Sequence, residues 1–353
     1  MNKVKLNKYI SEYSVKNKKN KPYPVYSVTN SNGFCTEYFT KDVSSKDKEN
    51  YKLVPFGYFA YNPSRINVGS IDCQEKEDTV IVSPLYTVFK CSDNIDKHYL
   101  KYFFKSRYGM NLINSSVSGS VRFNLKFKTL GEFQITERTL EEQKFAVNLF
   151  EKINGVISSS NKQLVLLDEL IKSRFNEMFG KIITSGERDT IFGEICDSTI
   201  GLTYKPDNIS DEGTIVLRSG NIKNAELQTV EDIVKVKGII IPEEKIVRDL
   251  DILMCARNGS ARLVGKTCII HKPKEEMSFG AFMSIIRTKY PYIVHHFMNS
   301  DYFRVQLKST QTASVNQITN GMLKGYKIFE PTLEEELQFR TFVEQIDKLK
   351  FTC

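Results

Sequence analysis

Two stretches of the chain, 193 residues apart, share one pattern of apolar and polar positions. Residues 137–154 align without gaps on residues 330–347, and seven of the eighteen positions are identical. Directly before each stretch, alternating apolar residues predict a short strand. The strand residues are Leu130, Phe133 and Ile135 in the first copy and Leu323, Tyr326 and Ile328 in the second. Each half of the chain is therefore expected to end with a strand, a turn and a helix.

Both helices have the same predicted start. Thr139 and Thr332 are each followed three residues later by a glutamate, Glu142 and Glu335. In this capping-box spacing the threonine hydroxyl accepts the N–H of the glutamate, and the carboxylate accepts the N–H of the threonine. We therefore expect each helix to begin directly after its threonine.

The first of the two helices carries a heptad pattern. Its stripe positions follow one another at steps of four and three residues, which is typical of a helix that packs against one partner helix. These positions are Ile153, Ile157, Ser160, Leu164, Leu167, Ile171, Arg174 and Met178. A helix over residues 140–179, with Gly180 as its C-terminal cap, would be about 60 Å long. This length favours an exposed spacer over a core helix of one domain.

The segments before the two helices predict separate domains. Both contain short runs of β-branched and aromatic residues between Gly, Asn, Asp and Pro turns, which is typical of the α+β fold class. A chain of 353 residues is also long enough for two cores. We predict a first domain at residues 1–136, a central long helix at 137–180, a second domain at 181–329 and a short C-terminal helix at 330–353.

Composition and charge narrow the class of protein only moderately. The chain is 41% hydrophobic and 26% charged, as globular proteins are, and no window of eighteen uninterrupted apolar residues predicts a membrane span. The basic N-terminus is not followed by an apolar run, so we expect a cytoplasmic protein. A net charge of +8 suits a polyanionic partner, although an ordinary basic protein would carry the same charge.

The cysteines and histidines predict no metal site. Seven cysteines are scattered without a C-x-x-C pair, and only four histidines accompany them. A zinc site or a disulfide framework would need closer spacing, so we expect reduced and mostly buried thiols. The neighbouring His295 and His296 point in different directions on a helix, which favours one surface and one core position over metal ligands.

Taken in order, these motifs resemble the specificity subunits of type I restriction-modification systems. The resemblance covers nearly the whole chain. In the helices it is carried by the opening Leu140-Glu-Glu-Gln143 and by residues 170–180 and 342–351. In the domains it is carried by residues 61–71 and 82–86, and by residues 201–203, 213–222, 251–259 and 265–266.

This resemblance implies two target-recognition domains, each closed by a long helix, with a central coiled-coil spacer between them. The domains would read the two halves of a bipartite double-stranded DNA target. The helices would bind two methyltransferase subunits and, in the full enzyme, restriction and translocase subunits. S-adenosylmethionine would belong to the methyltransferase, and ATP and Mg to the restriction subunit, so this chain would need no cofactor and no catalytic residue. The expected subunit-interface residues are Ile153, Ile157, Leu164, Leu167, Ile171 and Met178. The short second helix departs from the family pattern.

Candidate DNA contacts lie in polar loops beside glycine. Arg reads guanine, Asn and Gln read adenine, and Lys, Arg and hydroxyl groups bind phosphates. In the first domain the candidates are Arg65, Asn67 and Ser70, and Ser120, Arg122, Asn124 and Lys126. In the second domain they are Arg218, Ser219 and Asn221, Arg257, Asn258, Arg262 and Lys266, and Ser314, Asn316 and Gln317. The loops at 118–126 and 310–317 are favoured because they precede equivalent strands.

Two rival classes of protein remain open. Pro206-Asp207 and Glu243-Glu244-Lys245 are fragments that a stand-alone metal nuclease could use, although such fragments arise often by chance. The heptad pattern alone would also suit a coiled-coil adaptor. The sequence has neither a methyltransferase motif nor a Walker loop, so the chain is not expected to transfer methyl groups or to hydrolyse ATP.

Overall fold

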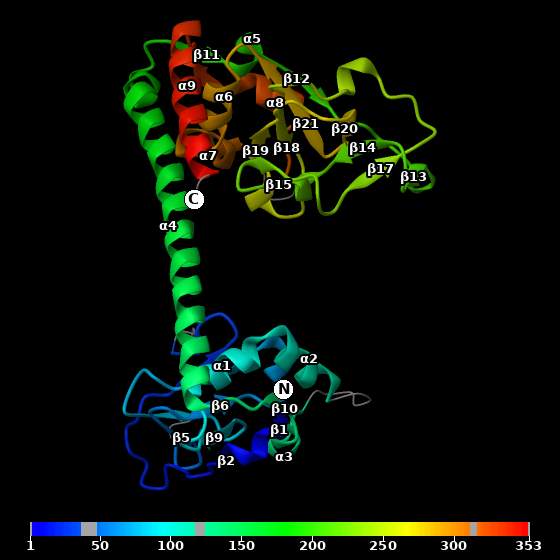
Figure 1. Ribbon diagram of the computed structural model, residues 1–353. Helices are drawn as coiled ribbons and strands as arrows, with labels where there is room; N and C mark the ends of the chain where they lie inside the picture. Colours follow the sequence, from blue (N-terminus) through cyan, green and yellow to red (C-terminus); the bar gives the residue numbers. More distant parts are fainter. Residues whose placement is uncertain (1, 37–47, 117–123, 311–315, 352–353) are drawn as a thin grey trace. The chain divides into compact units, whose positions relative to one another are not determined.

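The computed structural model describes residues 2–36, 48–116, 124–310 and 316–351. The chain divides into two compact units, Met1–Ser158 and Ser159–Cys353, which we call unit 1 and unit 2. The division falls inside one continuous helix, α4 (Leu140–Ser185), drawn in green in Figure 1. Each unit has its own apolar core.

Unit 1 consists of short strands followed by helices. Its strands are β1 (Lys3–Lys5), β2 (Ile10–Glu12), β3 (Ser27–Thr29), β4 (Gly33–Cys35), β5 (Lys52–Pro55), β6 (Phe59–Tyr61), β7 (Ile71–Cys73), β8 (Thr79–Val82), β9 (Thr87–Cys91) and β10 (Gln134–Thr136). Its helices are α1 (Lys97–Lys105), α2 (Arg107–Ser115), α3 (Phe127–Gly131) and the first part of α4.

Unit 2 repeats this order with additional strands. Its strands are β11 (Asp189–Ile191), β12 (Cys196–Ile200), β13 (Ile209–Ser210), β14 (Thr214–Leu217), β15 (Ile222–Lys223), β16 (Glu226–Leu227), β17 (Val234–Val236), β18 (Ile252–Cys255), β19 (Thr267–Ile269), β20 (Met277–Phe279), β21 (Met283–Thr288) and β22 (Lys327–Phe329). Its helices are α5 (Phe192–Ile195), α6 (Pro291–Met298), α7 (Asp301–Thr310), α8 (Asn320–Gly325) and α9 (Leu333–Lys350), with the second part of α4.

The central sheets of the two units have the same topology. Their strand orders are β2-β9-β6-β7 in unit 1 and β12-β21-β18-β19 in unit 2. The register agrees as well: Phe59 of β6 lies opposite Phe89 and Cys73, and Ile252 of β18 lies opposite Ile286 and Ile269. The units are therefore two copies of one fold, and the predicted α+β fold class is confirmed.

The closing strands and helices of the two copies also agree. Strand β10 pairs with β1, and β22 pairs with β11, both in antiparallel orientation. Leu130 and Leu323, which the alternating pattern placed in these strands, lie instead in the short helices α3 and α8. Both leucines are almost fully buried, because each short helix turns its one apolar side toward the core of its unit. The prediction of a strand at these two positions was wrong.

Both predicted capping boxes are present. The Glu142 N–H donates to the Thr139 hydroxyl over 3.3 Å, and the Thr139 N–H donates to the Glu142 carboxylate over 2.8 Å. At α9 the Glu335 N–H donates to the Thr332 hydroxyl over 3.2 Å, and the Thr332 N–H donates to the Glu335 carboxylate over 2.8 Å. These reciprocal bonds satisfy N–H groups that have no partner inside the helix, and they start α4 and α9 where the sequence predicts.

The C-terminal end of α4 differs from its prediction. The helix continues through Gly180 to Ser185, and Gly186, with a φ of +71°, follows it. Ile182 and Ile183 pack against the core of unit 2, and this burial offsets the cost of a glycine inside a helix. The hydroxyl oxygen of Tyr302 would lie 3.2 Å from a Cβ at position 180, so the glycine also permits a close approach.

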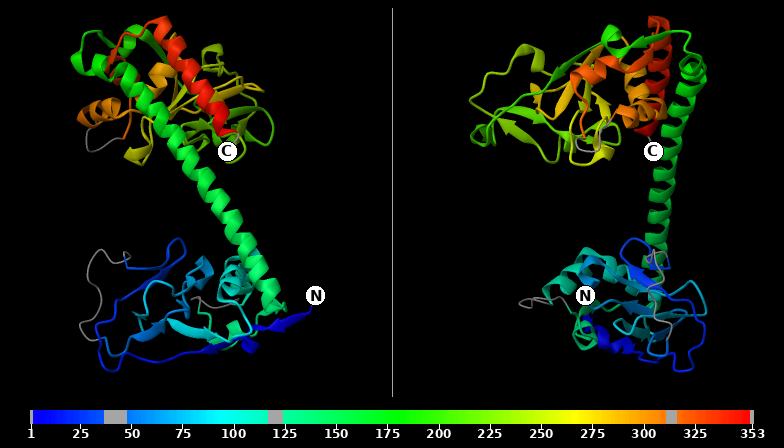
Figure 2. Two further views of the ribbon diagram at one scale, coloured as in Figure 1. Left: turned by 60° about the vertical axis from the view of Figure 1, so that its left-hand side comes forward. Right: turned by 180° about the vertical axis from the view of Figure 1, so that it is seen from behind.

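Helix α9 packs against the second part of α4 within unit 2 (Figure 2). The ring centroid of Phe339 lies 5.6 Å from that of Phe175 and 5.7 Å from that of Phe179. The Lys350 ammonium lies 2.7 Å from the Asp168 carboxylate. The C-terminal part of the predicted stripe is therefore covered by the core of unit 2.

Among the described helices none is both long and apolar enough to cross a membrane.

Candidate nucleic-acid interface

In unit 2, two polar segments that are distant in sequence lie side by side. The Ile318 N–H donates to the Ala256 carbonyl over 2.7 Å, at the start of the loop between β18 and β19. The Asn258 N–H donates to the Asn316 carbonyl over 3.3 Å, and the Asn316 amide donates to the Gly259 carbonyl over 3.1 Å. The fold thus places the segment before α8 against the loop after β18.

A third segment joins them. The Asn258 amide donates to the Ser219 hydroxyl over 3.1 Å. Arg218, beside Ser219, is exposed and donates to the Asp232 carbonyl. Three predicted segments therefore form one surface, which we call the unit 2 patch: Arg218, Ser219, Arg257, Asn258, Asn316 and Gln317. Arg262 is an exposed cation on the same loop as Asn258.

Unit 1 has the corresponding arrangement. The Leu125 N–H donates to the Pro63 carbonyl over 3.1 Å, and the Tyr61 hydroxyl donates to the Leu125 carbonyl over 3.1 Å. Leu125 is equivalent to Ile318, and Pro63 is equivalent to Ala256. The two residues of each equivalent pair are 193 positions apart in the sequence. The segment before α3 thus lies against the loop after β6. The unit 1 patch consists of Arg65, Asn67, Asn124 and Lys126, of which only Asn67 is half-buried.

Three residues that were predicted to contact DNA are buried or half-buried inside their unit. Ser70 and Asn221 are only 4% and 1% exposed, and the Asn221 side chain bonds the Arg218 N–H and the Gln228 carbonyl. Lys266 is half-buried, donates to the Ile222 carbonyl over 2.8 Å, and has its pKa lowered by burial. Asn221 and Lys266 support the loops because their polar atoms are already bonded inside the unit, and Ser70 is buried. Ser120, Arg122 and Ser314 lie outside the described residues.

An exposed aromatic residue beside the unit 2 patch was not predicted. Phe282 is 59% exposed, and the Arg257 guanidinium lies 5.3 Å from its ring centroid. Its carbonyl accepts the N–H groups of Ala256 and Arg257 over 2.9 and 3.0 Å. In the sequence Phe282 stands beside the apolar residues of β21 and is indistinguishable from a core residue.

The predicted interface residues of α4 have unequal exposure. Ile153 and Ile157 are 46% and 52% exposed, whereas Ile171 is 5% exposed and belongs to the core of unit 2. Leu164, Leu167 and Met178 are half-buried. Exposed apolar side chains are therefore found along α4 as far as Val165, Leu166 and Leu170, whereas Ile171 stabilises unit 2.

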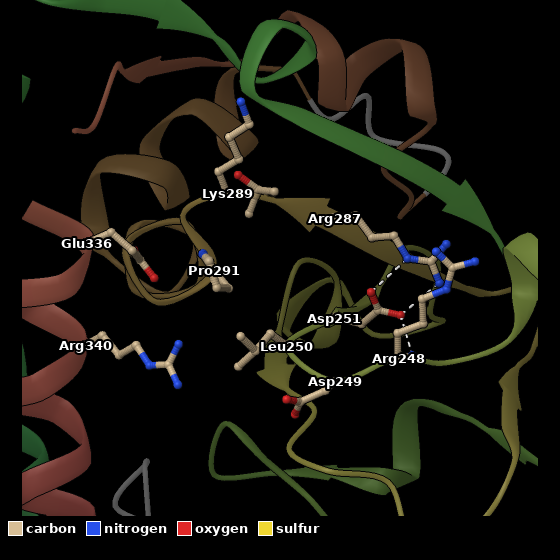
Figure 3. Close-up of a pocket in the computed structure, with 10 residues that line it drawn as sticks. Arg248, Asp249, Leu250, Asp251, Arg287, Lys289, Pro291, Glu336 and Arg340 are labelled. Carbon is tan, nitrogen blue, oxygen red and sulfur yellow. Dashed lines mark hydrogen bonds and ion pairs between the residues drawn. The ribbon is translucent and has the colours of Figure 1, made fainter. Parts of the chain in front are cut away.

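Arg287 and Asp251, which line a hollow of about 360 Å³ in unit 2, form an ion pair (Figure 3). The Arg287 guanidinium donates to the Asp251 carboxylate over 2.8 and 2.9 Å, which raises the pKa of Arg287, and it also donates to the Ile246 carbonyl. Glu336 also lines the hollow, and its carboxylate accepts the N–H groups of Tyr292 and Ile293. This pairing is typical of a structural ion pair that ties loops together.

Two side chains that were considered for a metal site have other contacts. The Glu243 carboxylate accepts a hydrogen bond from Arg248, and the buried His295 ring lies 3.0 Å from the Thr267 hydroxyl. His296 is also largely enclosed, and its Nδ1 atom lies 2.8 Å from the Tyr292 carbonyl. The sequence analysis expected one of the two histidines at the surface, but neither is exposed. Among the described residues no group of three or more His, Cys, Asp or Glu side chains is arranged to hold a metal ion.

The duplicated α+β units and the long helix have the fold of the S subunits of type I restriction-modification systems. In sequence the chain is 28% identical, over 162 residues, to the type I restriction enzyme EcoKI specificity subunit of Escherichia coli (strain K12). That match covers 42% of this chain and 34% of the relative, so it spans about a third of the relative's length. No protein-family model matches the chain.

Two solved structures support the fold. A chain from a structure described as the basis of complex assembly and conformational transition of the type I R-M system superposes with a TM-score of 0.52 at 14% identity, covering 99% of this chain and 91% of that one. The type I restriction-modification S subunit from M. genitalium superposes with a TM-score of 0.50 at 13% identity, covering 99% and 90%. The resemblance inferred from the sequence motifs is confirmed.

Proposed function

We propose that this chain is the DNA sequence-specificity subunit of a type I restriction-modification enzyme. The observation that carries the proposal is the duplicated patch: each unit brings the loop after the second strand, in chain order, of its central sheet, β6 or β18, against the segment before its last short helix. Two copies of one fold with differently composed polar patches suit the reading of two different DNA half-sites.

The side chains of the patches have the chemistry that base reading requires. Arg257 and Asn258 in unit 2, and Arg65 and Asn67 in unit 1, are donors and acceptors of the kinds that pair with guanine and adenine edges. Lys126 and Arg262 are exposed cations that would bind phosphates. In this proposal Ser219 and Asn316 orient Asn258, because both bond the loop that carries it.

The partners belong to the proposal as well. The exposed apolar face of α4, which includes Phe145, Leu149 and Ile153, would bind the methyltransferase subunits, and restriction and translocase subunits would join the complete enzyme. S-adenosylmethionine would then be bound by the methyltransferase, and ATP with Mg by the restriction subunit. No residue of this chain is assigned a chemical step; its part is to choose the DNA sequence.

Methylome sequencing of cells with and without this gene tests the proposal. We expect one bipartite motif to lose its methylation when the gene is deleted and to regain it when the gene is restored. A methylome that is the same in both strains, or purified chain that cleaves DNA with magnesium and no partner, would contradict the proposal.

Replacement of one patch residue gives a sharper test. Arg257→Ala should weaken binding of the target about 10- to 100-fold, because a bidentate contact to guanine contributes about 1–3 kcal/mol. Lys289→Ala is the matched control: Lys289 is an exposed cation directly after β21, whereas Phe282, which contacts Arg257, directly precedes that strand. Binding is measured by fluorescence anisotropy, and co-purification with the methyltransferase should be unchanged in both variants. Equal binding by the two variants would remove Arg257 from the DNA contacts.

A further inference from the structure

The two units share a four-residue turn that the sequence comparison does not align. In unit 1 the Tyr86 N–H donates to the Ser83 carbonyl over 3.0 Å, and in unit 2 the Met283 N–H donates to the Gly280 carbonyl over 2.8 Å. Each turn leads into the strand that lies second in its central sheet, β9 or β21. The turns are therefore equivalent, and Leu85 and Phe282 hold the same third position.

Both third positions expose an apolar side chain. Leu85 is 77% exposed and Phe282 is 59% exposed, although glycine, asparagine and aspartate are the usual residues of such turns. The residues that follow them, Tyr86 and Met283, are only 8% and 1% exposed and belong to the cores. The fold thus has no structural need for an apolar side chain at the third position, yet both units present one.

Each turn lies at the edge of the polar patch of its own unit. In unit 2 the Phe282 carbonyl accepts the N–H groups of Ala256 and Arg257, and the Arg257 guanidinium lies 5.3 Å from the Phe282 ring centroid. In unit 1 Tyr61 pairs with Thr87, so the turn before β9 and the loop after β6 leave the sheet at the same end. The exposed apolar side chain of unit 2 therefore lies beside hydrogen-bonding side chains, and unit 1 has its apolar side chain at the equivalent position of the fold.

We propose that Leu85 and Phe282 are specificity residues that contact thymine 5-methyl groups in the major groove, each in the half-site read by its own unit. The inference rests on the proposed function. The thymine methyl is the apolar group that a base pair presents in the major groove, and Phe is among the side chains that contact it. Arg257, which is stacked on Phe282, would read a guanine adjacent to that thymine.

The surroundings favour DNA over a protein partner at this position. Arg257, Asn258 and Ser219 around Phe282 supply donors, and the loop is linked to the segment before α8 through Asn316. Serine is depleted in protein–protein interfaces, whereas base edges require hydrogen-bond donors beside any apolar contact.

The test uses the purified full chain and duplexes that carry the bipartite motif found by methylome sequencing. Each thymine is replaced in turn by deoxyuridine, which removes the methyl group and keeps the base pair. We expect one thymine in each half-site at which the wild-type Kd rises about fourfold, the effect of one buried methyl group. Phe282→Ser should abolish this effect in one half-site and Leu85→Ser in the other.

Matched variants separate the contact from a loss of folding. Ile240→Ser in unit 2 and Val15→Ser in unit 1 remove other exposed apolar side chains, 93% and 45% exposed, and should keep both deoxyuridine effects. Phe282→Leu, which gives unit 2 the residue of unit 1, should keep sensitivity to the methyl group. Thermal midpoints of all variants should stay close to that of the wild type, because the replaced side chains are exposed.

The outcomes distinguish this inference from the proposed function. If the wild type binds target and scrambled duplexes equally, both fail. If it prefers the target but no deoxyuridine changes the Kd, or a half-site has no thymine, the methyl contact alone is overturned. It is also overturned if Phe282→Ser weakens binding to thymine and deoxyuridine duplexes by the same factor, or if it abolishes co-purification with the methyltransferase.

Discussion

A buried polar residue joins the closing helix to the N-terminal end of an earlier helix in each unit. Gln143 and Glu336 are 2% and 6% exposed, and each is the fourth residue of its helix, α4 or α9. The Gln143 side-chain oxygen accepts the N–H of Asp96, the N-cap residue of α1, over 2.7 Å. The Glu336 carboxylate accepts the N–H groups of Tyr292 and Ile293, in the first turn of α6, over 2.9 and 3.0 Å. The two residues perform the same task.

The choice between amide and carboxylate follows from the neighbouring groups. Gln143 also donates to the carbonyls of Asn94 and Arg138, so it needs an N–H group. Glu336 faces two donors and therefore needs two acceptors, although burial raises the pKa of its carboxyl. A carboxylate at a helix N-terminus is also favoured by the helix dipole.

Exchanging the two residues should destabilise both units. Gln143→Glu would bury a carboxylate against two carbonyls and is expected to lower the free energy of unfolding by about 2–3 kcal/mol. Glu336→Gln would turn an amide N–H₂ toward a backbone N–H, at a cost of about 1–2 kcal/mol. Glu141→Gln, at an exposed neighbouring position, is the control and should change stability by less than about 0.5 kcal/mol. Urea unfolding gives these values, and no loss in the Gln143 variant would refute the assigned role.

At the scale of the element, α4 has two different kinds of apolar surface. Phe175 and Phe179 are 2% and 0% exposed and pack with Phe339 of α9. Phe145 and Leu149, nearer the start of the helix, are 72% and 48% exposed. The same helix therefore stabilises unit 2 with its phenylalanines near the C-terminal end and has exposed apolar side chains nearer its start.

Charges on the exposed part of α4 should affect association and not folding. Leu149→Lys combined with Ile153→Lys is expected to leave the unfolding midpoint unchanged and to reduce co-purification with the methyltransferase subunit at least tenfold. Phe175→Ala should do the opposite, lowering the stability of unit 2 by about 3–5 kcal/mol through the cavity it leaves. Unchanged co-purification of the double variant would exclude this face as the subunit interface.

At the scale of the whole molecule, two enclosed histidines make the stability of unit 2 depend on pH. His295 and His296 are enclosed in unit 2, and burial lowers the pKa of His295 well below its usual value and that of His296 to about 4. An unfolded histidine has a pKa of about 6.5, so unfolding takes up protons below that pH. Stability that is fully present above pH 6.5 is therefore lost as the pH falls toward 4.

Unit 2 should lose about 2 kcal/mol between pH 7 and pH 5 through His296 alone. His296→Phe removes the titrating group and should flatten this dependence, even though it also removes the bond to the Tyr292 carbonyl. His271→Gln, at an exposed position, should keep the slope of the wild type. Urea unfolding followed by circular dichroism at the two pH values provides the measurement, and equal slopes in all three proteins would contradict the assignment.

Sequence comparison could recognise only part of the duplication. The closing segments keep one offset, 193 residues, so Ile135 and Ile328 or Gln143 and Glu336 align directly. Elsewhere the offset changes: Leu85 and Phe282 are 197 residues apart, because the loops between the strands differ in length. Equivalent residues there lie at the same position in the paired strands of their sheets, although the number of residues between them along the chain differs. This position can be recognised only when the pairing of the strands is known.

The amino-acid sequence by itself determined the features that act over a few neighbouring residues: the capping boxes at Thr139 and Thr332 and the apolar stripe of α4. Such features depend on spacing along one helix, which the sequence contains directly. Only the tertiary structure decided which polar residues meet at a surface, as Asn258 does with Ser219 and Asn316, and which become buried supports, as Asn221 does. The reason is that long-range pairing of strands and loops sets both proximity and burial, and no local pattern encodes either one.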